Sequence, residues 1–457
     1  MNQNSGAAVE SQTTLKKELK FGTVMMFVVS IVIGSGVFYK PHALYIATGG
    51  SPGIGILAWV VGGVLSWLGA LTAAEVAAAV PKTGGMIEWL RTAFGDVCAY
   101  LLGWAQTVVV GPAFVAALAI IFSKTVIALL GVGESWMLPI AAAVVIVLLV
   151  IDSVSVKAGS NINAITGVIK IIPIAIIAIV GFIKGPSLGA GVVNLTPFFN
   201  SGGDTGIVAA LSGGVLATLF AYQGWIDTGT MAGEMKNPGR DLPRALSLGL
   251  LIIAAVYITI NVAYLFVFPA EYYMGTDTPA LDVANKLFGP AGGTFINIGI
   301  LISVFGALNS NTMAYVRSPY ALAIQKELPF SGLLGKLHPT LRTPVNAAVY
   351  MFIMVVIFAL SKNYDFLTDL CVVTMWVFYV LVFAAVIKLR KTQPELDRPY
   401  KVPLYPIVPI ISIIGGILVV VLSLMKDFQT NVIGIAVTLC GLPVYYLTKR
   451  YYAKKSS

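Results

Sequence analysis

Long apolar runs recur along the whole chain and are separated by short polar segments. Each run is close to the length of about 20 residues that an α-helix needs to cross a bilayer. The runs fall near residues 21–47, 54–80, 97–130, 136–152, 158–183, 207–232, 243–268, 293–320, 344–361, 364–389, 405–425 and 431–448. The pattern therefore predicts an all-α polytopic membrane protein with twelve transmembrane helices. The connections are too short to hold a separate soluble domain.

Two of these runs are interrupted in the middle. The first contains Ile33-Gly34-Ser35-Gly36-Val37, and the second contains the segment 220–225, Phe-Ala-Tyr-Gln-Gly-Trp. Glycine weakens a helix, so backbone N–H and C=O groups there can leave the helical hydrogen-bond ladder. Such groups are tolerated at membrane depth only where protein buries them or where they line a cavity. The pair of breaks predicts a binding site, and the N–H groups after Gly34 favour an anion such as a carboxylate.

The two breaks also predict an internal repeat. Five predicted spans separate the start of the first broken helix from the start of the second, and an odd number inverts the topology. The expected organisation is a 5+5 inverted repeat of 21–184 (helices 1–5) and 207–390 (helices 6–10), in which helices 1 and 6 are discontinuous. Helices 11 and 12 occupy 405–448 outside the repeat. Cytoplasmic tails are expected at 1–20 and 449–457.

The charge pattern supports a membrane protein and gives its orientation. The 457 residues are 58% hydrophobic and 11% charged, far from the composition of a soluble domain. Most of the 29 Lys and Arg residues fall in loops on one side of the predicted membrane, which places both termini in the cytoplasm. This bias accounts for the net charge of +9, so no nucleic-acid partner is predicted.

The chain has little material for catalysis or metal binding. Its only histidines are His42 and His338, and Cys98, Cys371 and Cys440 lie in apolar stretches without metal-ligand spacing. We therefore predict no catalytic residues, no metal site and no cofactor. An integral-membrane enzyme, which would need a nucleophile, base or metal cluster, is disfavoured, as is a passive channel, which would need a continuous polar lining.

Four motifs in order resemble the amino acid, polyamine and organocation superfamily, and within it the L-type amino acid transporters. The closest similarity is to bacterial serine/threonine or alanine/serine/cysteine exchangers, over Leu15 to Tyr446. The resemblance implies a leucine-transporter-like fold and sodium-independent exchange of neutral L-amino acids across a plasma membrane by alternating access. The motifs are residues 33–38, 75–85, 220–225 and 234–245.

The resemblance assigns main-chain groups to the amino acid substrate. The N–H groups of Ser35, Gly36 and Val37 would hold the carboxylate, while carbonyls near Val32 and Phe220 would take the ammonium. Main-chain recognition reads only the part that all amino acids share.

Side chains near the second break would set substrate size. Phe220 matches the aromatic residue that covers the substrate from the outer side, and Gln223 occupies a position that is glycine in family members with large substrates. The longer side chain favours Ala, Ser, Thr and Cys over leucine or tryptophan. Trp376 fits a pocket wall or core packing, and Tyr222 fits a substrate-site or gating role or packing alone.

Lys170 is the most informative charged residue. It lies about twelve residues, roughly 18 Å, from the nearer end of its predicted span, and an intramembrane charge is usually functional. The resemblance implies that its ammonium lies between the first broken helix and span eight, where sodium-coupled relatives hold a cation. A wet inner vestibule or a misplaced span boundary is the alternative. Asn309 and Ser310 are its candidate polar neighbours, unless they only pack between helices.

Two acidic residues are candidates for an inner gate. Glu75 and Glu234 could form a network with Arg91, or the loop around Glu234 could be solvated. The resemblance also bears on partners, because mammalian relatives carry a cysteine between spans three and four through which a heavy subunit is attached. This chain has none in Gly131–Ser135, which predicts no disulfide-linked partner and a bacterial origin.

The leading prediction is thus an exchanger of small neutral amino acids in the cell membrane. Proton-coupled symport is the alternative, because Glu75, Asp227 or Glu234 could carry a proton. Sodium-coupled uptake is a further alternative, against which Lys170 argues.

Overall fold

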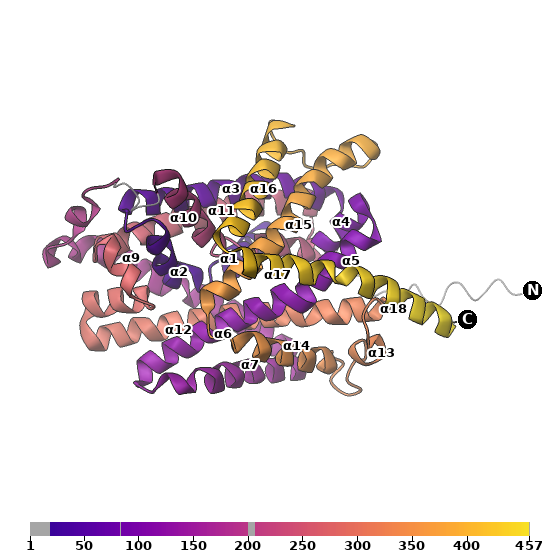
Figure 1. Cartoon of the computed structure of the whole chain (residues 1–457), viewed down its shortest axis with the longest axis horizontal. Coiled ribbons are helices and arrows are strands. Elements are labelled where there is room, and N and C mark those ends of the chain that lie inside the picture. The colour runs from indigo at the N-terminus through magenta and orange to yellow at the C-terminus, as the bar shows by residue number, and fades with distance from the viewer. Residues whose placement is uncertain (1–18, 83, 200–205, 457) are drawn as a thin grey trace, which may run out of the picture.

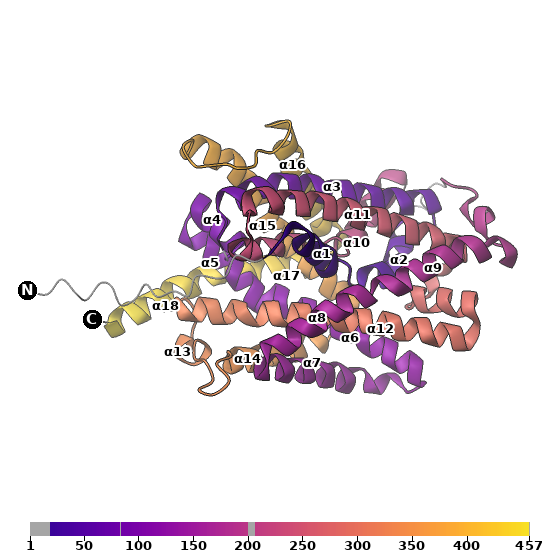
Figure 2. The same ribbon diagram turned by 180° about the vertical axis from the view of Figure 1, so that it is seen from behind.

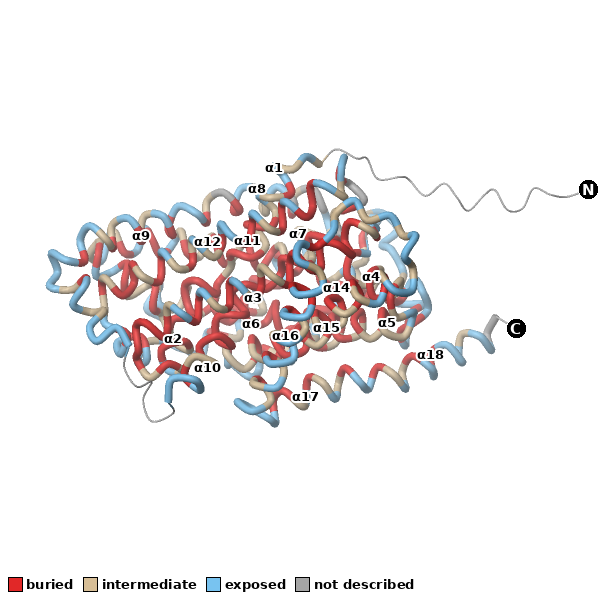
Figure 3. The backbone as a smooth tube through the Cα atoms, turned by 90° about the horizontal axis from the view of Figure 1, so that it is seen from above, coloured by how far each residue is buried: buried red, intermediate tan, exposed pale blue. Residues whose placement is uncertain are grey.

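The computed structural model describes residues 19–82, 84–199 and 206–456, and these fold as a bundle of helices without strands (Figure 1). Most helices run along the long axis of the bundle. The C-terminus lies at one end, together with α4 and α13, and this end is called proximal below (Figure 1). The opposite end, which carries α2, α9 and α10, is called distal. Buried residues concentrate in the middle of the bundle (Figure 3).

The helices form because long apolar stretches with few charges satisfy their own backbone in hydrocarbon. Their bounds are α1 Phe21–Val32, α2 Gly36–Ala47, α3 Pro52–Ala79, α4 Met86–Phe94, α5 Asp96–Ala105, α6 Gly111–Leu130, α7 Met137–Val154, α8 Val156–Ile169, α9 Ile171–Lys184, α10 Ile207–Leu219, α11 Pro238–Leu265, α12 Pro279–Ile324, α13 Ser331–Leu334, α14 Val345–Ala359, α15 Tyr364–Thr392, α16 Ile407–Lys426, α17 Phe428–Leu439 and α18 Gly441–Ser456. A π-helical turn, Gln106–Val110, joins α5 to α6.

The described residues contain nine helices long and apolar enough to cross a membrane, or ten if the bent pair α1 and α2 counts as one span. Two further apolar helices are shorter, α10 and α14. At 1.5 Å per residue the 13 residues of α10 span only about 20 Å, because the helix ends at Leu219 where the chain turns. The bundle is a polytopic membrane fold, and the count of twelve spans stays a prediction.

Helix α12 is longer than any predicted span because two helices join in it. Gly289 has φ 68° and ψ −179° inside this 46-residue element, so the chain changes direction there. The part after the kink contains the predicted span 293–320. The part before it forms a short separate helix at the distal end (Figure 1).

The core is built by helices that are far apart in sequence. Helix α1 packs on α11 and α10 packs on α3, while α12 contacts both α6 and α8. Helix α15 packs on α6, α3 and α16. These contacts hold both interrupted segments inside the bundle.

Candidate binding site at two helix breaks

The first break separates α1 from α2, and the two helices meet at an angle of 45°. The last bond of α1 runs from Ile33 N–H to Val29 O at 3.0 Å, and bonding resumes where Phe38 and Tyr39 donate to Ser35 O at 3.1 and 3.2 Å. In the described chain, the N–H groups of residues 34–37 have no backbone acceptor. Open donors at a helix N-terminus are an anion-binding feature.

The second break follows α10. Residues 220–224 form a turn in which Gln223 N–H donates to Phe220 O at 3.1 Å, and a 3₁₀-helix then runs over Trp225–Glu234. Gly224 has φ 102°, a conformation that other residues rarely adopt. The glycine therefore allows the chain to pass from the turn into the 3₁₀-helix.

The two breaks touch each other. A Cβ atom placed on Gly36 would lie 2.6 Å from Ala221 Cβ and 2.7 Å from Ala221 Cα. The hydroxyl of Tyr257 on α11 donates to Val32 O at 3.1 Å and to Ala221 O at 2.9 Å, so a single proton is shared between both breaks. Sequence reasoning missed Tyr257, whose only signal is a tyrosine within the apolar run 243–268.

Lys170 binds main-chain carbonyl groups at the first break. It lies between α8 and α9, its side chain is 2% exposed, and Nζ donates to Ile33 O at 2.8 Å and to Ser30 O. The α8–α9 segment and α1 lie together in the view from behind (Figure 2). The ammonium thus binds main-chain oxygens left open where α1 ends, rather than reaching a wet vestibule.

The predicted polar neighbours of Lys170 bind elsewhere. Asn309 Nδ2 donates to Gly159 O at 2.9 Å and to Asn163 Oδ1, and Ser310 Oγ donates to Gly306 O on its own helix at 3.0 Å. Their pairing with Lys170 was therefore wrong. Asn309 instead joins α12 to α8, which was the packing alternative, because its side chain points to the turn of α8 nearest α12.

Aromatic rings cover the breaks on the distal side. Ser35 Oγ is 3.1 Å from the hydroxyl oxygen of Tyr364, and the Phe220 ring centroid lies 5.8 Å from that of Tyr364. Phe114 packs against Phe220 at 4.8 Å. Phe220 therefore lies beside Tyr364, which contacts Ser35 in the first break, and its covering role over a substrate stays a prediction.

An ion pair between a buried lysine and a partly exposed aspartate lies next to these rings. Lys40 is 1% exposed, and its Nζ is 2.7 Å from both Asp365 Oδ1 and Thr368 Oγ1. The ammonium is also 4.9 Å from the Tyr364 ring and 5.6 Å from the Phe220 ring, within reach of a cation–π interaction. Sequence reasoning missed this pair, because Lys40 reads as a lysine near a span end.

A polar cavity of about 330 Å³ lies on the far side of the ion pair. Tyr364 and Asp365 line it, so Tyr364 stands between the cavity and Ser35, to which it is hydrogen-bonded. The other lining residues are Tyr39, His42, Ile121, Lys124, Asp277, Lys362 and Asn363. The cavity is therefore a polar vestibule, and Asp365 of the ion pair and the side chain of Tyr364 form part of its wall.

Three predicted pocket residues differ in their surroundings. Tyr222 donates to Trp59 O at 2.9 Å and packs 5.2 Å from the Tyr257 ring, which is the packing alternative. Gln223 is buried and its Nε2 donates to Cys371 O on α15 at 3.3 Å, while Oε1 has no partner among the described residues. Trp376 lies 5.5 Å from Tyr379 and faces Gly416 of α16, so its described contacts are those of core packing.

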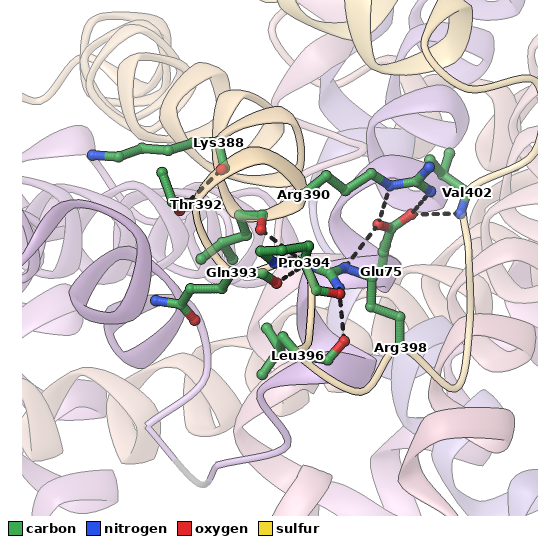
Figure 4. A network of polar contacts seen from close by, with 10 residues as sticks. Glu75, Lys388, Arg390, Thr392, Gln393, Pro394, Leu396, Arg398 and Val402 are labelled. Atoms are coloured by element: carbon green, nitrogen blue, oxygen red, sulfur yellow. Dashed lines mark hydrogen bonds and ion pairs between the residues drawn. The ribbon is translucent and has the colours of Figure 1, made fainter.

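The predicted contact of Glu75 with Arg91 is wrong. Glu75 is 2% exposed and accepts from Arg390 Nε at 2.7 Å, from Arg390 Nη2 at 2.6 Å and from Val402 N–H at 2.7 Å (Figure 4). Arg91 binds Glu88 at 3.2 Å and Asp96 at 2.5 Å. The reason is topological, because α15 returns to the proximal end of α3, whereas α4 turns Arg91 toward the start of α5.

Arg398 extends this proximal network into the loop after α15. Its guanidinium lies 3.7 Å from Glu75 Oε1 and donates to four main-chain carbonyls, those of Leu389, Gln393, Pro394 and Leu396 (Figure 4). Burial raises the pKa of Tyr400 in the same loop to about 12, so its hydroxyl stays neutral. The side chain of Glu234, the other gate candidate, lies outside the described residues.

Comparison with known proteins agrees with this architecture. Residues 19–442 match the family model "Amino acid permease". The serine/threonine exchanger SteT of Bacillus subtilis is 38% identical over 95% of this chain and 98% of its own length. The human b(0,+)-type amino acid transporter 1 is 30% identical over 96% and 89%, and the human cystine/glutamate transporter is 28% identical over 96% and 86%.

These relatives are transporters, and the match covers nearly all of the chain. The long apolar helices and the interrupted segments at the centre of the bundle fit the same class. The chain therefore belongs to the amino acid permease family of the amino acid, polyamine and organocation superfamily, and it is an amino acid transporter of the membrane.

Proposed function

We propose that this transporter is a sodium-independent exchanger of small neutral L-amino acids, working by alternating access in a bacterial cell membrane. One observation carries the proposal: the two breaks touch at Gly36 and Ala221, with open N–H groups on one side and Lys170 on the carbonyl side. A relative that is 38% identical carries the name of a serine/threonine exchanger, which supports the same mode.

The proposed substrate contacts follow from these main-chain groups. The N–H groups of Ser35, Gly36 and Val37 bind the carboxylate, because they have no backbone acceptor and lie at the N-terminus of α2. The carbonyls of Val32 and Phe220 take the ammonium. Each already accepts one hydrogen bond, from Tyr257 and from Gln223 N–H, and a carbonyl oxygen has a second lone pair.

Lys170 supports sodium independence. A fixed ammonium on the carbonyls of Ser30 and Ile33 occupies the oxygens that a metal cation would need. Because this partner is part of the chain itself, the break keeps its shape without an ion gradient.

We also propose the 5+5 inverted repeat of 21–184 and 207–390, with 405–448 outside it. The packing supports it, because helix 1 of the first half (α1) packs on the second helix of the other half (α11), and its counterpart α10 packs on α3. Alternating access would then move one half-bundle against the other around the central breaks.

Counterflow in proteoliposomes tests the exchange mode. Vesicles preloaded with unlabelled L-serine should accumulate labelled L-serine at least tenfold faster than empty vesicles, with or without sodium or a pH gradient. Uptake into empty vesicles that depends on an inward proton gradient would instead establish proton-coupled symport, and dependence on sodium would contradict the role of Lys170.

The size of Gln223 predicts substrate selectivity. Its side chain occupies space between the second break and α15, where it donates to Cys371 O. Gln223→Gly should widen the site, so that leucine competes with labelled alanine at least fivefold better than in the wild type. Counterflow with alanine and leucine measures this. An unchanged leucine-to-alanine ratio would remove Gln223 from the pocket wall.

The Lys40–Asp365 pair is proposed to close the vestibule above the breaks. Lys40→Met should weaken this closure, because Asp365 and Thr368 lose their buried partner. Cys371 is buried one turn beyond Thr368 and serves as a reporter once Cys98 and Cys440 are replaced by serine. Its reaction with a water-soluble thiol reagent should accelerate at least fivefold.

The matched control is Lys426→Met. Lys426 of α16 pairs at 2.6 Å with Asp369, which lies one turn after Asp365 in α15, but Lys426 is 40% exposed whereas Lys40 is 1% exposed. Its loss should leave the Cys371 reaction unchanged. Equal rates for both variants would mean that the Lys40 pair does not close the path.

A further inference from the structure

An apolar cavity of about 360 Å³ lies away from the helix breaks, where α4 and α5, α15 and α17 meet. Helices α17 and α18 run along one edge of the bundle (Figure 3), so the cavity is at the periphery. Its lining is Phe94, Val97, Cys98, Leu101, Thr374, Val377, Phe378, Leu381, Ile435, Thr438 and Leu439. A cavity of this kind inside a bilayer is filled by hydrocarbon, because its walls offer water few partners.

A cation stands at the proximal end of this cavity. The lining positions of α15 recur at helical spacing from Thr374 to Leu381, and the same face reaches Lys388 two turns later, about 10 Å further on. Lys388 Nζ lies 4.5 Å from the ring centroid of Phe94, which lines the cavity. The two features are therefore continuous.

Lys388 is not neutralised by the protein. Its side chain is exposed, and in the described part of the chain no carboxylate lies within 4.0 Å of its ammonium. Lys391, one turn further along α15, is also exposed and has no such ion pair there. Neighbouring Arg390 differs, because its guanidinium is held by Glu75 (Figure 4). One available cation, Lys388, thus borders an apolar cavity, and a second, Lys391, follows it along α15.

We propose that this groove binds one anionic phospholipid, with its phosphate on Lys388 and one acyl chain in the cavity. Lys388 lies fourteen positions after Thr374, a rise of about 21 Å along the helix, comparable to the roughly 15 Å of hydrocarbon in one leaflet plus a headgroup. A zwitterionic lipid would bring a second positive charge to Lys388, so charge complementarity selects the anionic class. The site is independent of the exchange mode.

The lipid would contact the helix that carries much of the transport machinery. Helix α15 holds Asp365 at its distal end, the Cys371 carbonyl beside Gln223, and Arg390 at its proximal end. An acyl chain between α5, α15 and α17 fills the space behind that helix. Occupancy should therefore stabilise α15 against the rest of the bundle.

Native mass spectrometry of the purified full chain tests the site. With phosphatidylglycerol and phosphatidylcholine supplied at equal concentrations, the wild type should retain one phosphatidylglycerol at least fivefold more than phosphatidylcholine. Lys388→Ala should lower that retention at least fivefold. The control is Lys401→Ala, which removes the same charge from the exposed loop after α15.

A second measurement reports on the acyl chain itself. Cys98 lines the cavity, so in a Cys371→Ser, Cys440→Ser background phosphatidylglycerol should slow its reaction with an apolar maleimide at least threefold, while inorganic phosphate should not. Equal retention of both lipids, no effect of Lys388→Ala, or no protection of Cys98 would each overturn the proposal. So would a dimer, detected by its mass, in which a second copy covers Cys98.

Discussion

Gly36→Ala is expected to reduce exchange at least a hundredfold, the largest effect we predict for any single methyl group. The added Cβ would lie 2.6 Å from Ala221 Cβ and 2.7 Å from Ala221 Cα, closer than real Cβ contacts come. Because one of these atoms is backbone, the two breaks must separate, and the donors and acceptors for the substrate separate with them. Counterflow of labelled L-serine measures the loss.

Two other glycines serve as matched controls for this substitution. A Cβ on Gly34, in the same break, would lie 3.6 Å from Ala307 Cβ, an ordinary contact, and a Cβ on Gly22 in α1 would meet nothing within 4 Å. Gly22→Ala should retain full exchange, and Gly34→Ala should retain far more than Gly36→Ala. Exchange by Gly36→Ala within twofold of the wild type would show that close contact of the breaks is not required.

Lys170→Ala should lower exchange at least tenfold while the protein still reaches the membrane. The carbonyls of Ser30 and Ile33 lose their donor, and an unsatisfied buried polar group costs about 1–3 kcal/mol. The end of α1 should then rearrange, and the site with it. Counterflow and the thermal transition of the detergent-purified variant measure the two effects separately.

The control for Lys170 is Lys184→Ala in the same helical segment. Lys184 Nζ also donates to a main-chain carbonyl, that of Leu287 at 3.1 Å, but it lies at the distal end of α9. A comparable loss of exchange in both variants would mean that any missing carbonyl partner lowers activity. Unchanged exchange in Lys170→Ala would show that the contacts of Lys170 with the end of α1 are not needed for transport.

The helix interruptions and the contacts of Lys170 could be expected from the sequence, because their causes are local. Gly34, Gly36 and Gly224 weaken the helix at the positions where α1 and α10 end. A lysine deep in an apolar run needs buried acceptors, and Lys170 finds them on α1. These inferences use only the chain near each residue and the properties of hydrocarbon.

The remaining contacts depend on pairings between distant segments. Glu75 binds Arg390, which is 315 residues away, and Lys40 binds Asp365 at a separation of 325. A single sequence offers several arginines for Glu75, and Arg91 was the nearest in the chain. Tyr257 could not be identified for the same reason, because nothing in the apolar run 243–268 shows that its hydroxyl contacts both breaks.

The helix count shows a second limit of sequence reasoning. Hydropathy measures apolar length, but the break at Phe220–Gly224 shortens α10 to 13 residues, and the 46 residues of α12 comprise two helices that meet at the kink of Gly289. An apolar window therefore does not correspond to one helix. The same holds for Trp376, where an aromatic residue in an apolar helix reads equally as a pocket wall or as core.

A structure of the protein with bound L-serine would show whether the main-chain groups of the two breaks bind the substrate. We predict that the carboxylate lies about 3 Å from the nitrogens of Ser35, Gly36 and Val37, and the ammonium at the same distance from the Val32 and Phe220 carbonyls. An amino acid bound only in the polar vestibule beside Asp365, with the N–H groups of residues 35–37 empty, would contradict substrate binding at the two breaks.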